Sequence, residues 1–166
     1  EGLQRDMYAL AIDRLAGAGY EHYEVSNFAR AGCRSRHNQV YWSGQGYFAY
    51  GPGAARYING VRETNHRSTT AYIARVLGGQ TPIAETERLG PEDAARERLV
   101  FALRRLEGVD TKLFATATGF STEELGGEAL PRLIELGLLE DVAGRLRLTR
   151  RGLMVSDAIW PELLRM

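Results

Sequence analysis

Residues 23–42 read YEVSNFARAGCRSRHNQVYW, a stretch that opens as a strand and then gathers polar and aromatic side chains. Tyr23 and Val25 alternate with polar neighbours, as in a strand with one buried face. Before it, apolar residues recur every four positions over residues 3–16, which predicts an amphipathic helix ending at a glycine turn. Because a helix, a turn and a strand are the repeating step of α/β proteins, we predict an α/β fold.

The region that follows this strand lacks a clear hydrophobic period. We expect residues 26–46 to form a long ordered loop, and such loops often carry function. Short strands are expected near 48–51 and 55–58, with a turn at Asn59-Gly60. A helix beginning at Ser68 or Thr69 should run to Leu77, where two glycines stop it.

After Pro82 the pattern becomes mostly helical, so we predict two domains, residues 1–82 and 83–166. Gly90-Pro91 starts a helix, and Ser121 with Glu124 forms a capping-box pattern. The expected elements are helices over 91–106, 111–117 and 122–136 (with a break at Gly126-Gly127), a hairpin of 138–140 with 145–148, and a helix from Thr149 toward Trp160 that Pro161 kinks or ends. This order is typical of a winged-helix-like domain.

Composition excludes several classes of function. Lysine plus arginine and aspartate plus glutamate number 21 each, so no net charge attracts nucleic acid or an anionic membrane. Cys33 is the single cysteine, which rules out an internal disulfide and any all-cysteine metal site within the chain. No apolar run reaches the length of a membrane span, so we expect a cytoplasmic protein, with peripheral membrane association left open. The helix beginning almost at Glu1 suggests part of a longer protein.

Two pairs of residues in the quoted stretch are the first candidates for a binding site. His37-Asn38 precedes Tyr41-Trp42, and an imidazole can ligate a metal or haem iron while aromatic rings stack on a flat ligand. The alternative is that Tyr41 and Trp42 only anchor the segment to the core. From the residues alone the structural alternative is favoured.

Other candidates are open in the same way. Glu24 and Asn27 flank the end of a strand, where α/β proteins bind ligands, but they would equally stabilise a turn. The glycine cluster Gly51-Pro52-Gly53-Ala54-Ala55 lets backbone approach a cofactor, or simply turns the chain between strands. Cys33 has no base or orienting partner nearby in sequence and is interpreted as a bystander. We assign no catalytic residue.

The winged-helix-like half also raises a nucleic-acid-binding alternative. Its candidate recognition helix carries four glutamates against Arg132, which would repel phosphates. Four arginines between 145 and 151 keep this alternative open.

Three motifs together resemble a known family. They are Tyr23-Glu24-x-Ser26-x-Phe28-Ala29, the element His37-Asn38-x-x-Tyr41-Trp42 (hereafter the HN-x-x-YW element), and Gly51-x-Gly53-Ala54. The chain resembles the C-terminal part of the oxygen-independent coproporphyrinogen III oxidase-like radical SAM proteins, in particular the haem-chaperone branch known as HemW. Leu136–Leu139 and the pattern Leu148-Thr149-x-Arg151-Gly152-Leu153 also match, so the resemblance covers essentially the whole chain.

The resemblance implies the last segment of a partial (β/α)6 barrel followed by the C-terminal domain. It implies haem or porphyrin as ligand and haem-receiving proteins as partners. It also implies S-adenosylmethionine and a [4Fe–4S] cluster, whose CxxxCxxC motif this chain lacks, so the chain alone is expected to be inactive. His37 becomes a candidate haem ligand, with Asn38, Tyr41, Trp42, Glu24 and Asn27 around it and Gly53, Ala54 and Ala55 beside the adenosylmethionine.

Two points limit the transfer from the family. Many members read Ala-His-Gly where this chain has Ala54-Ala55-Arg56, so no role of that histidine is carried over. The family also contains authentic coproporphyrinogen oxidases, which lack the HN-x-x-YW element. The resemblance therefore favours haem binding and delivery, with porphyrin oxidation as the alternative.

Overall fold

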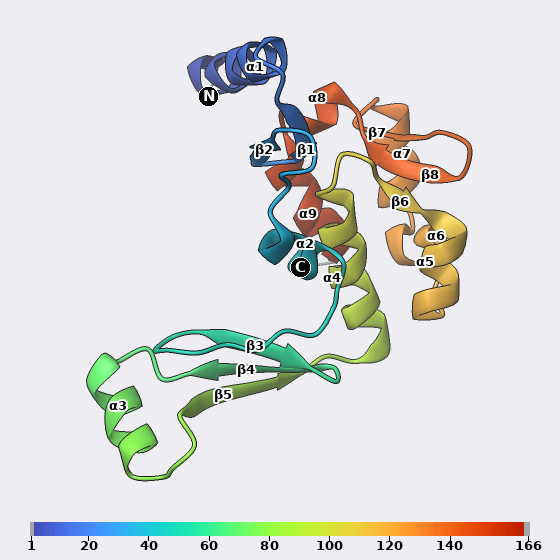
Figure 1. The fold of residues 1–166 in the computed structure, drawn as a ribbon. Helices are drawn as coiled ribbons and strands as arrows, with labels where there is room; N and C mark the ends of the chain where they lie inside the picture. The colour runs from blue at the N-terminus through green and yellow to red at the C-terminus, as the bar shows by residue number, and fades with distance from the viewer. Residues whose placement is uncertain (1, 165–166) are drawn as a thin grey trace.

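The computed structural model describes residues 2–164 and places a projecting sheet on a helical body (Figure 1). The first half comprises α1 (Gly2–Gly17), β1 (Glu21–Glu24), β2 (Asn27–Ala29), α2 (Arg36–Trp42), β3 (Ala55–Ile58), β4 (Val61–Asn65), α3 (Thr69–Leu77) and β5 (Ile83–Arg88). The second half comprises α4 (Pro91–Leu103), β6 (Val109–Asp110), α5 (Thr111–Thr118), α6 (Thr122–Gly126), α7 (Ala129–Glu135), β7 (Leu139–Asp141), β8 (Arg145–Leu148), α8 (Arg150–Leu153) and α9 (Ser156–Leu164).

Helices and strands are mixed along the chain, and each strand pairing among residues 2–164 is antiparallel. The strands form a β1-β2 hairpin, a β3-β4-β5 sheet and a small β6-β8-β7 sheet. The mixed α/β class is therefore confirmed. A parallel barrel segment is not seen within the described residues, because β1 pairs antiparallel with β2 and its residue Glu24 makes an isolated antiparallel bridge to Arg105.

Most of the hydrophobic core lies in the second half around α4, and Ile12 and Val25 of the first half join it. Leu99 and Leu103 of α4 are fully buried, and they pack with Ile159 and Leu163 of α9. The remaining fully buried leucines come from α6, α7, β7 and β8, namely Leu125, Leu133, Leu139 and Leu146. The helical body is thus held by one continuous core, and α4 is packed into that core along its buried face.

The helix starts, the helix break and the hairpin predicted for the second half are confirmed, although α4 ends at Leu103 and not at 106. Pro91 is the first residue of α4, and Ser121 with Glu124 forms a complete capping box at α6. The expected break falls at Gly127, whose φ of 48° and ψ of −132° interrupt the helix between α6 and α7. The hairpin of β7 and β8 turns through Ala143 and Gly144, both at positive φ.

The first half departs from the prediction between residues 26 and 51. In place of one long loop, the chain forms β2 and then the seven-residue helix α2, capped by the Ser35 side chain. A helix this short shows no hydrophobic period, so its only sequence signal was the capping serine. The strand expected at 48–51 is also wrong, since β3 begins at Ala55 and only Tyr47 makes an isolated bridge, to Tyr57.

The last predicted helix is divided in two. The chain breaks at Met154 and Val155, between α8 and α9, and Pro161 lies inside α9 instead of ending it. Proline removes one intrahelical hydrogen bond, yet its neighbours Trp160 and Leu163 are buried in the core. Their packing holds the helix through the proline.

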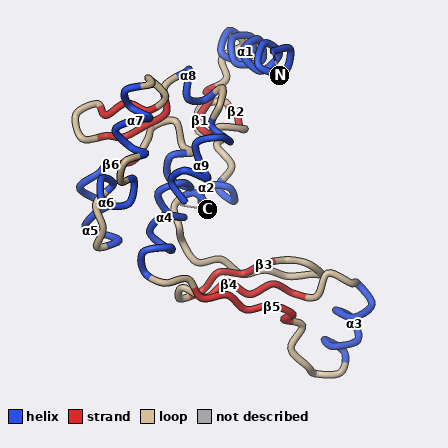
Figure 2. Tube along the Cα trace, turned by 180° about the vertical axis from the view of Figure 1, so that it is seen from behind, coloured by secondary structure: helices blue, strands red, loops and turns tan. Residues whose placement is uncertain are grey.

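The β3-β4-β5 sheet projects away from the body, and α3 lies at its far end (Figures 1 and 2). β5 pairs with β4 along its length, with Val61 opposite Arg88. The domain boundary between residues 82 and 83 stays a prediction. The pairing of β5 favours placing it after Arg88, at the start of α4.

Arg96 fastens three helices together inside the core. Its side chain is 3% exposed and donates hydrogen bonds to the carbonyl oxygens of Leu125 and Leu163 and to the carboxylate of Glu92. These partners belong to α6, α9 and α4. The guanidinium therefore satisfies carbonyl groups at two helix ends that would otherwise be buried without partners.

Replacing Arg96 with methionine is expected to lower the free energy of unfolding by about 2 kcal/mol, because two buried carbonyls lose their donor. Urea denaturation measures the loss. The matched control is Arg132→Met, since Arg132 pairs with Glu162 but its side chain is 58% exposed. That control should change stability by less than about 1 kcal/mol, and equal losses at the two sites would contradict the role assigned to Arg96.

Candidate functional site

The HN-x-x-YW element forms the helix α2. Ser35 caps it by accepting a hydrogen bond from the backbone nitrogen of Asn38 at 3.2 Å. His37 and Tyr41 are one turn apart, so their rings meet edge to face with centroids 4.9 Å apart. The Tyr41 hydroxyl lies 3.2 Å from His37 Nε2, and His37 itself is exposed. The helix therefore presents an imidazole to solvent beside an aromatic ring.

Trp42 attaches this helix to α4. Its ring packs against Phe101, with centroids 5.9 Å apart, and the Arg104 guanidinium lies 4.6 Å from its ring centroid. The indole nitrogen is buried and has no hydrogen-bond partner within the described residues. Cation–π contact and ring packing thus fix the indole.

Glu24 lies behind this contact and is fully buried. Its Oε1 accepts a hydrogen bond from Nε of Arg104 at 2.9 Å, and Nη2 of the same guanidinium forms an ion pair with this oxygen at 2.8 Å. Its Oε2 accepts from the backbone nitrogen of Ser26 at 3.0 Å and from Nδ2 of Asn27 at 2.5 Å. Glu24 and Asn27 therefore hold the β1-β2 turn and orient Arg104, which in turn covers Trp42.

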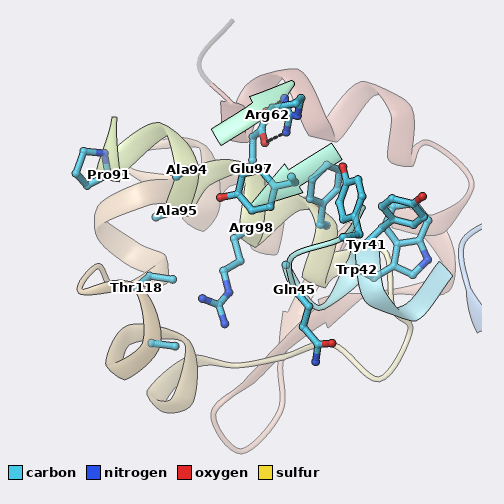
Figure 3. A pocket seen from close by; sticks show the side chains of 15 residues that line it. Tyr41, Trp42, Gln45, Arg62, Pro91, Ala94, Ala95, Glu97, Arg98 and Thr118 are labelled. Carbon is cyan, nitrogen blue, oxygen red and sulfur yellow. Dashed lines mark hydrogen bonds and ion pairs between the residues drawn. The ribbon is translucent and has the colours of Figure 1, made fainter. Parts of the chain in front are cut away.

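A cavity of about 420 Å³ lies on the other side of Tyr41 and Trp42, where α2, α4, α5 and the near end of the β3-β4-β5 sheet meet (Figure 3). This volume falls in the range of small-molecule sites. The lining is aromatic on one side and polar on the other; it comprises Tyr41, Trp42, Gly44, Gln45, Tyr47, Tyr57, Arg62, Pro91, Ala94, Ala95, Glu97, Arg98, Phe101, Ala117 and Thr118. We refer to it as the aromatic cavity.

The aromatic rings of the cavity wall form a connected set. Tyr41 meets Tyr47 edge to face with centroids 4.4 Å apart, and Tyr47 meets Tyr57 at 6.3 Å. Burial raises the pKa of the Tyr47 hydroxyl above its ordinary value. The Tyr47 hydroxyl therefore stays protonated at neutral pH and offers a neutral hydrogen-bonding group beside flat apolar ring faces.

The two cations of the cavity differ in their partners. Arg62 binds both oxygens of Glu97, at 3.2 and 2.5 Å, and also Glu87 at 2.9 Å. The hydrogen bonds that Arg62 donates to Glu97 raise the pKa of Arg62 above its already high ordinary value. Arg98 is half-buried, extends into the cavity, and has no ion-pair or hydrogen-bond partner among residues 2–164 (Figure 3).

The glycine cluster lies elsewhere. Gly53, at a φ of 70°, donates its backbone hydrogen to the His66 carbonyl at 3.0 Å, and Asn65 Nδ2 donates to the Gly51 carbonyl at 3.0 Å. Gly53, Ala54 and the first residue of β3, Ala55, lie at the end of the projecting sheet that carries α3. The structure therefore does not bring these residues together with His37.

Sequence reasoning missed the α4 side of the cavity. Ala94, Arg98 and Phe101 are spaced by four and three residues, so they share a face of α4 next to the face that carries Leu99 and Leu103. This spacing is visible in the sequence. A second, partly apolar face on a helix predicts only that another part of the protein packs there, and it does not predict a cavity. The strand residues Tyr57 and Arg62 gave no signal at all, since only tertiary folding brings them to α4.

No metal centre appears within residues 2–164, where no group of three or more histidine, cysteine, aspartate or glutamate side chains could hold a metal ion. Cys33 is exposed and unpaired by any disulfide. One cysteine cannot supply the three ligands of an iron–sulfur cluster. Across the same residues, no helix combines the length and apolarity needed to cross a membrane.

Comparison with known proteins gives consistent matches. Residues 89–155 match the HemN C-terminal domain family. The haem chaperone HemW of Bacillus subtilis is 32% identical over 97% of this chain, and that of Lactococcus lactis is 33% identical over 99%. The mitochondrial radical S-adenosyl methionine domain-containing protein 1 of Danio rerio is 32% identical over 95%. The chain spans 42%, 43% and 38% of these relatives' own lengths.

A solved structure has the same fold. The coproporphyrinogen III oxidase HemN of Escherichia coli, a radical SAM enzyme, superposes with a TM-score of 0.75 over 95% of this chain and 40% of its own. Its sequence identity is 17%, so this likeness concerns the fold alone.

Proposed function

The chain belongs to the HemW branch of the radical SAM family that also contains HemN, and from that premise we propose that it is the haem-binding C-terminal part of a haem chaperone. The complete protein would bind haem and deliver it to haem proteins. The chain spans about two fifths of its curated relatives, so delivery and the receiving proteins are properties proposed for the whole.

One observation carries the proposal, namely that the HN-x-x-YW helix forms one wall of the aromatic cavity. Tyr41 and Trp42 turn their rings to a space that also receives Tyr47, Tyr57 and Phe101. Flat aromatic walls suit a flat conjugated ligand, since ring faces stack and the apolar area is removed from water. His37, one turn before Tyr41, would then supply a nitrogen to the iron.

The hydrogen bond between His37 and Tyr41 must break before His37 can ligate iron through Nε2. Nε2 of His37 faces the Tyr41 hydroxyl, so iron ligation through that nitrogen requires the tyrosine to release it. Because His37 is exposed and the bond joins two side chains at the helix surface, the exchange needs only a rotamer change. Asn38, half-buried on the same helix, would flank the ligand as the family pattern implies.

Replacing His37 with alanine is expected to weaken haem binding at least tenfold, since loss even of groups behind a metal ligand costs about 10–100-fold. The change in the haem absorption spectrum that accompanies binding should disappear as well. Binding of iron-free protoporphyrin should stay within about twofold, because it needs the aromatic wall but no ligand. Titration of both compounds into the protein measures these effects.

The matched control is His66→Ala. His66 lies at the far end of the β3-β4-β5 sheet and uses only its backbone in the hydrogen bonds of that turn. This variant should bind haem as the unchanged protein does. Equal affinity and spectrum in the His37 and His66 variants would refute ligation by His37.

We retain two further parts of the proposal for the whole protein. Gly53, Ala54 and Ala55 would contact S-adenosylmethionine, and the [4Fe–4S] cluster would be held by cysteines that this chain does not contain. Cys33 does not fit that role, so no step in this chain runs through the cluster. We also keep the partial barrel, the cytoplasmic location and the winged-helix-like description of the second half as proposals; the β6-β8-β7 order supports the last of these.

The two alternative functions are less well supported. Curated relatives that cover nearly the whole chain are named as haem chaperones, whereas the oxidase HemN is similar in fold only. For a nucleic-acid-binding module, α7 contributes Arg132, but this arginine is already paired with Glu162. Haem binding thus remains the function that the geometry and the relatives favour together.

A further inference from the structure

We infer that Arg98 is the carboxylate-binding residue of the aromatic cavity, so that the cavity takes a flat ligand whose edge carries a carboxylate. This inference rests on the proposed haem-binding function and specifies it. Haem has propionate carboxylates at one edge of an otherwise apolar macrocycle. Arg98 would therefore fix which edge of the ligand enters the cavity.

Of the two arginines that line the cavity, Arg98 is the one without a carboxylate partner among the described residues. Arg62 already shares its charge with Glu97 and Glu87, both within 2.9 Å. Arg98 has no such partner among the described residues, although it is half-buried and points into the cavity between Thr118 and Gln45 (Figure 3). A cation in a partly desolvated site without a counter-charge favours an anionic ligand.

The direction of the Arg98 side chain is set by its surroundings. A Cβ placed on Gly44 would lie 3.4 Å from Cγ and 3.5 Å from Cδ and Nε of Arg98, so the glycine backbone lies against the arginine stem. Gly44 has a φ of 68°, a conformation that glycine adopts without strain. The stem is thus held by backbone, and its guanidinium loses less freedom when it binds a carboxylate.

The shape of the cavity matches the same ligand. Trp42 and Phe101 provide apolar faces on one side, and the aliphatic wall of α4 continues through Ala94. Arg98 lies on α4 one turn before Phe101, so an apolar ring against the aromatics would place its edge within reach of the guanidinium. A guanidinium binds a carboxylate through two parallel hydrogen bonds, which a lysine cannot do.

The test pairs the Arg98→Met variant with haem and with haem dimethyl ester, in which both propionates are uncharged. The protein as it stands should bind haem about tenfold more tightly than the ester. Arg98→Met should lose about tenfold in haem affinity but hold the ester within about twofold, so that the variant no longer distinguishes the two. Arg98→Lys should keep part of the preference, because it keeps the charge without the planar fork.

The control is Arg151→Met, which makes the same charge change at an exposed position on α8 and should alter neither affinity. If the unchanged protein binds haem but Arg98→Met retains the full preference for haem over its ester, the role of Arg98 is wrong while haem binding stands. If the unchanged protein binds neither compound, haem binding and the role of Arg98 both fail.

Discussion

Replacing Gly152 with alanine is expected to lower the free energy of unfolding by about 3 kcal/mol or more. A Cβ at this position would lie 1.8 Å from the carbonyl oxygen of Leu138 and 2.7 Å from its carbonyl carbon. Both contacts are with backbone, so no side-chain rotation can relieve them. The helix α8 must then move off β7, or the strand must shift.

The surrounding hydrogen bonds explain why this contact is so close. Thr149 caps α8 by accepting from the backbone nitrogen of Gly152 at 3.0 Å, and its own backbone nitrogen donates to the Leu138 carbonyl at 3.1 Å. The turn after β8 is thereby fastened to the start of β7. The Leu-Thr-x-Arg-Gly-Leu pattern noted in the sequence thus has a structural meaning: threonine caps the helix and glycine lets the strand backbone approach.

Thermal or urea denaturation of Gly152→Ala measures the effect, with Gly17→Ala as matched control. A Cβ on Gly17, at the end of α1, would meet nothing within 4 Å, and its φ is not in the left-handed region. Alanine there is expected to be neutral or to stabilise by up to about 1 kcal/mol, since alanine favours helix. A Gly152→Ala protein as stable as the Gly17 variant would show that α8 does not pack on β7 as described.

The sequence predicted the second half of this fold well because its helices carry long amphipathic periods and explicit caps. Pro91 and the Ser121–Glu124 box mark their starts, and the glycines at 126 and 127 mark the break. The helix α2 was missed because seven residues are too few for a hydrophobic period to be visible. The prediction that Pro161 ends or kinks the last helix rested on the strong local effect of proline. In the structure the packing of α9 outweighs this effect, and the helix continues through Pro161.

The candidate site was predictable only in part. The family resemblance pointed to His37 and Trp42, and the spacing of Tyr41 from His37 became interpretable once both were placed on a helix. The cavity itself joins α2, α4, α5, β3 and β4, whose lining residues run from Tyr41 to Thr118 in the sequence. No local sequence pattern predicts that these five elements meet. Arg98 was therefore identified as a cavity residue only from the structure.

Replacing Glu24 with glutamine is the last expected result, and it should both destabilise the protein and loosen the aromatic cavity. Removing one charge of a buried ion pair typically costs about 3–5 kcal/mol. Arg104 is 20% exposed and can recover some hydration, so a loss of about 2–3 kcal/mol is expected. The loss arises because the neutral amide ends the ion pair with Arg104 and cannot accept all three hydrogen bonds that the carboxylate accepts.

Glu24→Gln should also alter the wall of the aromatic cavity, because Glu24 orients Arg104 and Arg104 covers Trp42. With its carboxylate partner gone, the guanidinium is no longer held 4.6 Å from the Trp42 ring centroid. Trp42 fluorescence, read in a Trp160→Phe background so that only one indole emits, should change, and haem affinity should fall several-fold. These two readouts separate a positioning role from simple loss of stability, provided that they are measured well below the denaturation midpoint.

The control for Glu24→Gln is Glu140→Gln, which breaks the ion pair with Arg147 on the β7-β8 hairpin. Both side chains of that pair are about 40% exposed, so the change should cost less than about 1 kcal/mol and leave Trp42 unaffected. Should Glu24→Gln destabilise the protein yet leave Trp42 emission and haem affinity unchanged, Glu24 only holds the β1-β2 turn. Should stability, Trp42 emission and haem affinity all change, the Tyr23-Glu24-x-Ser26 motif and the HN-x-x-YW element act as one unit, joined by Arg104.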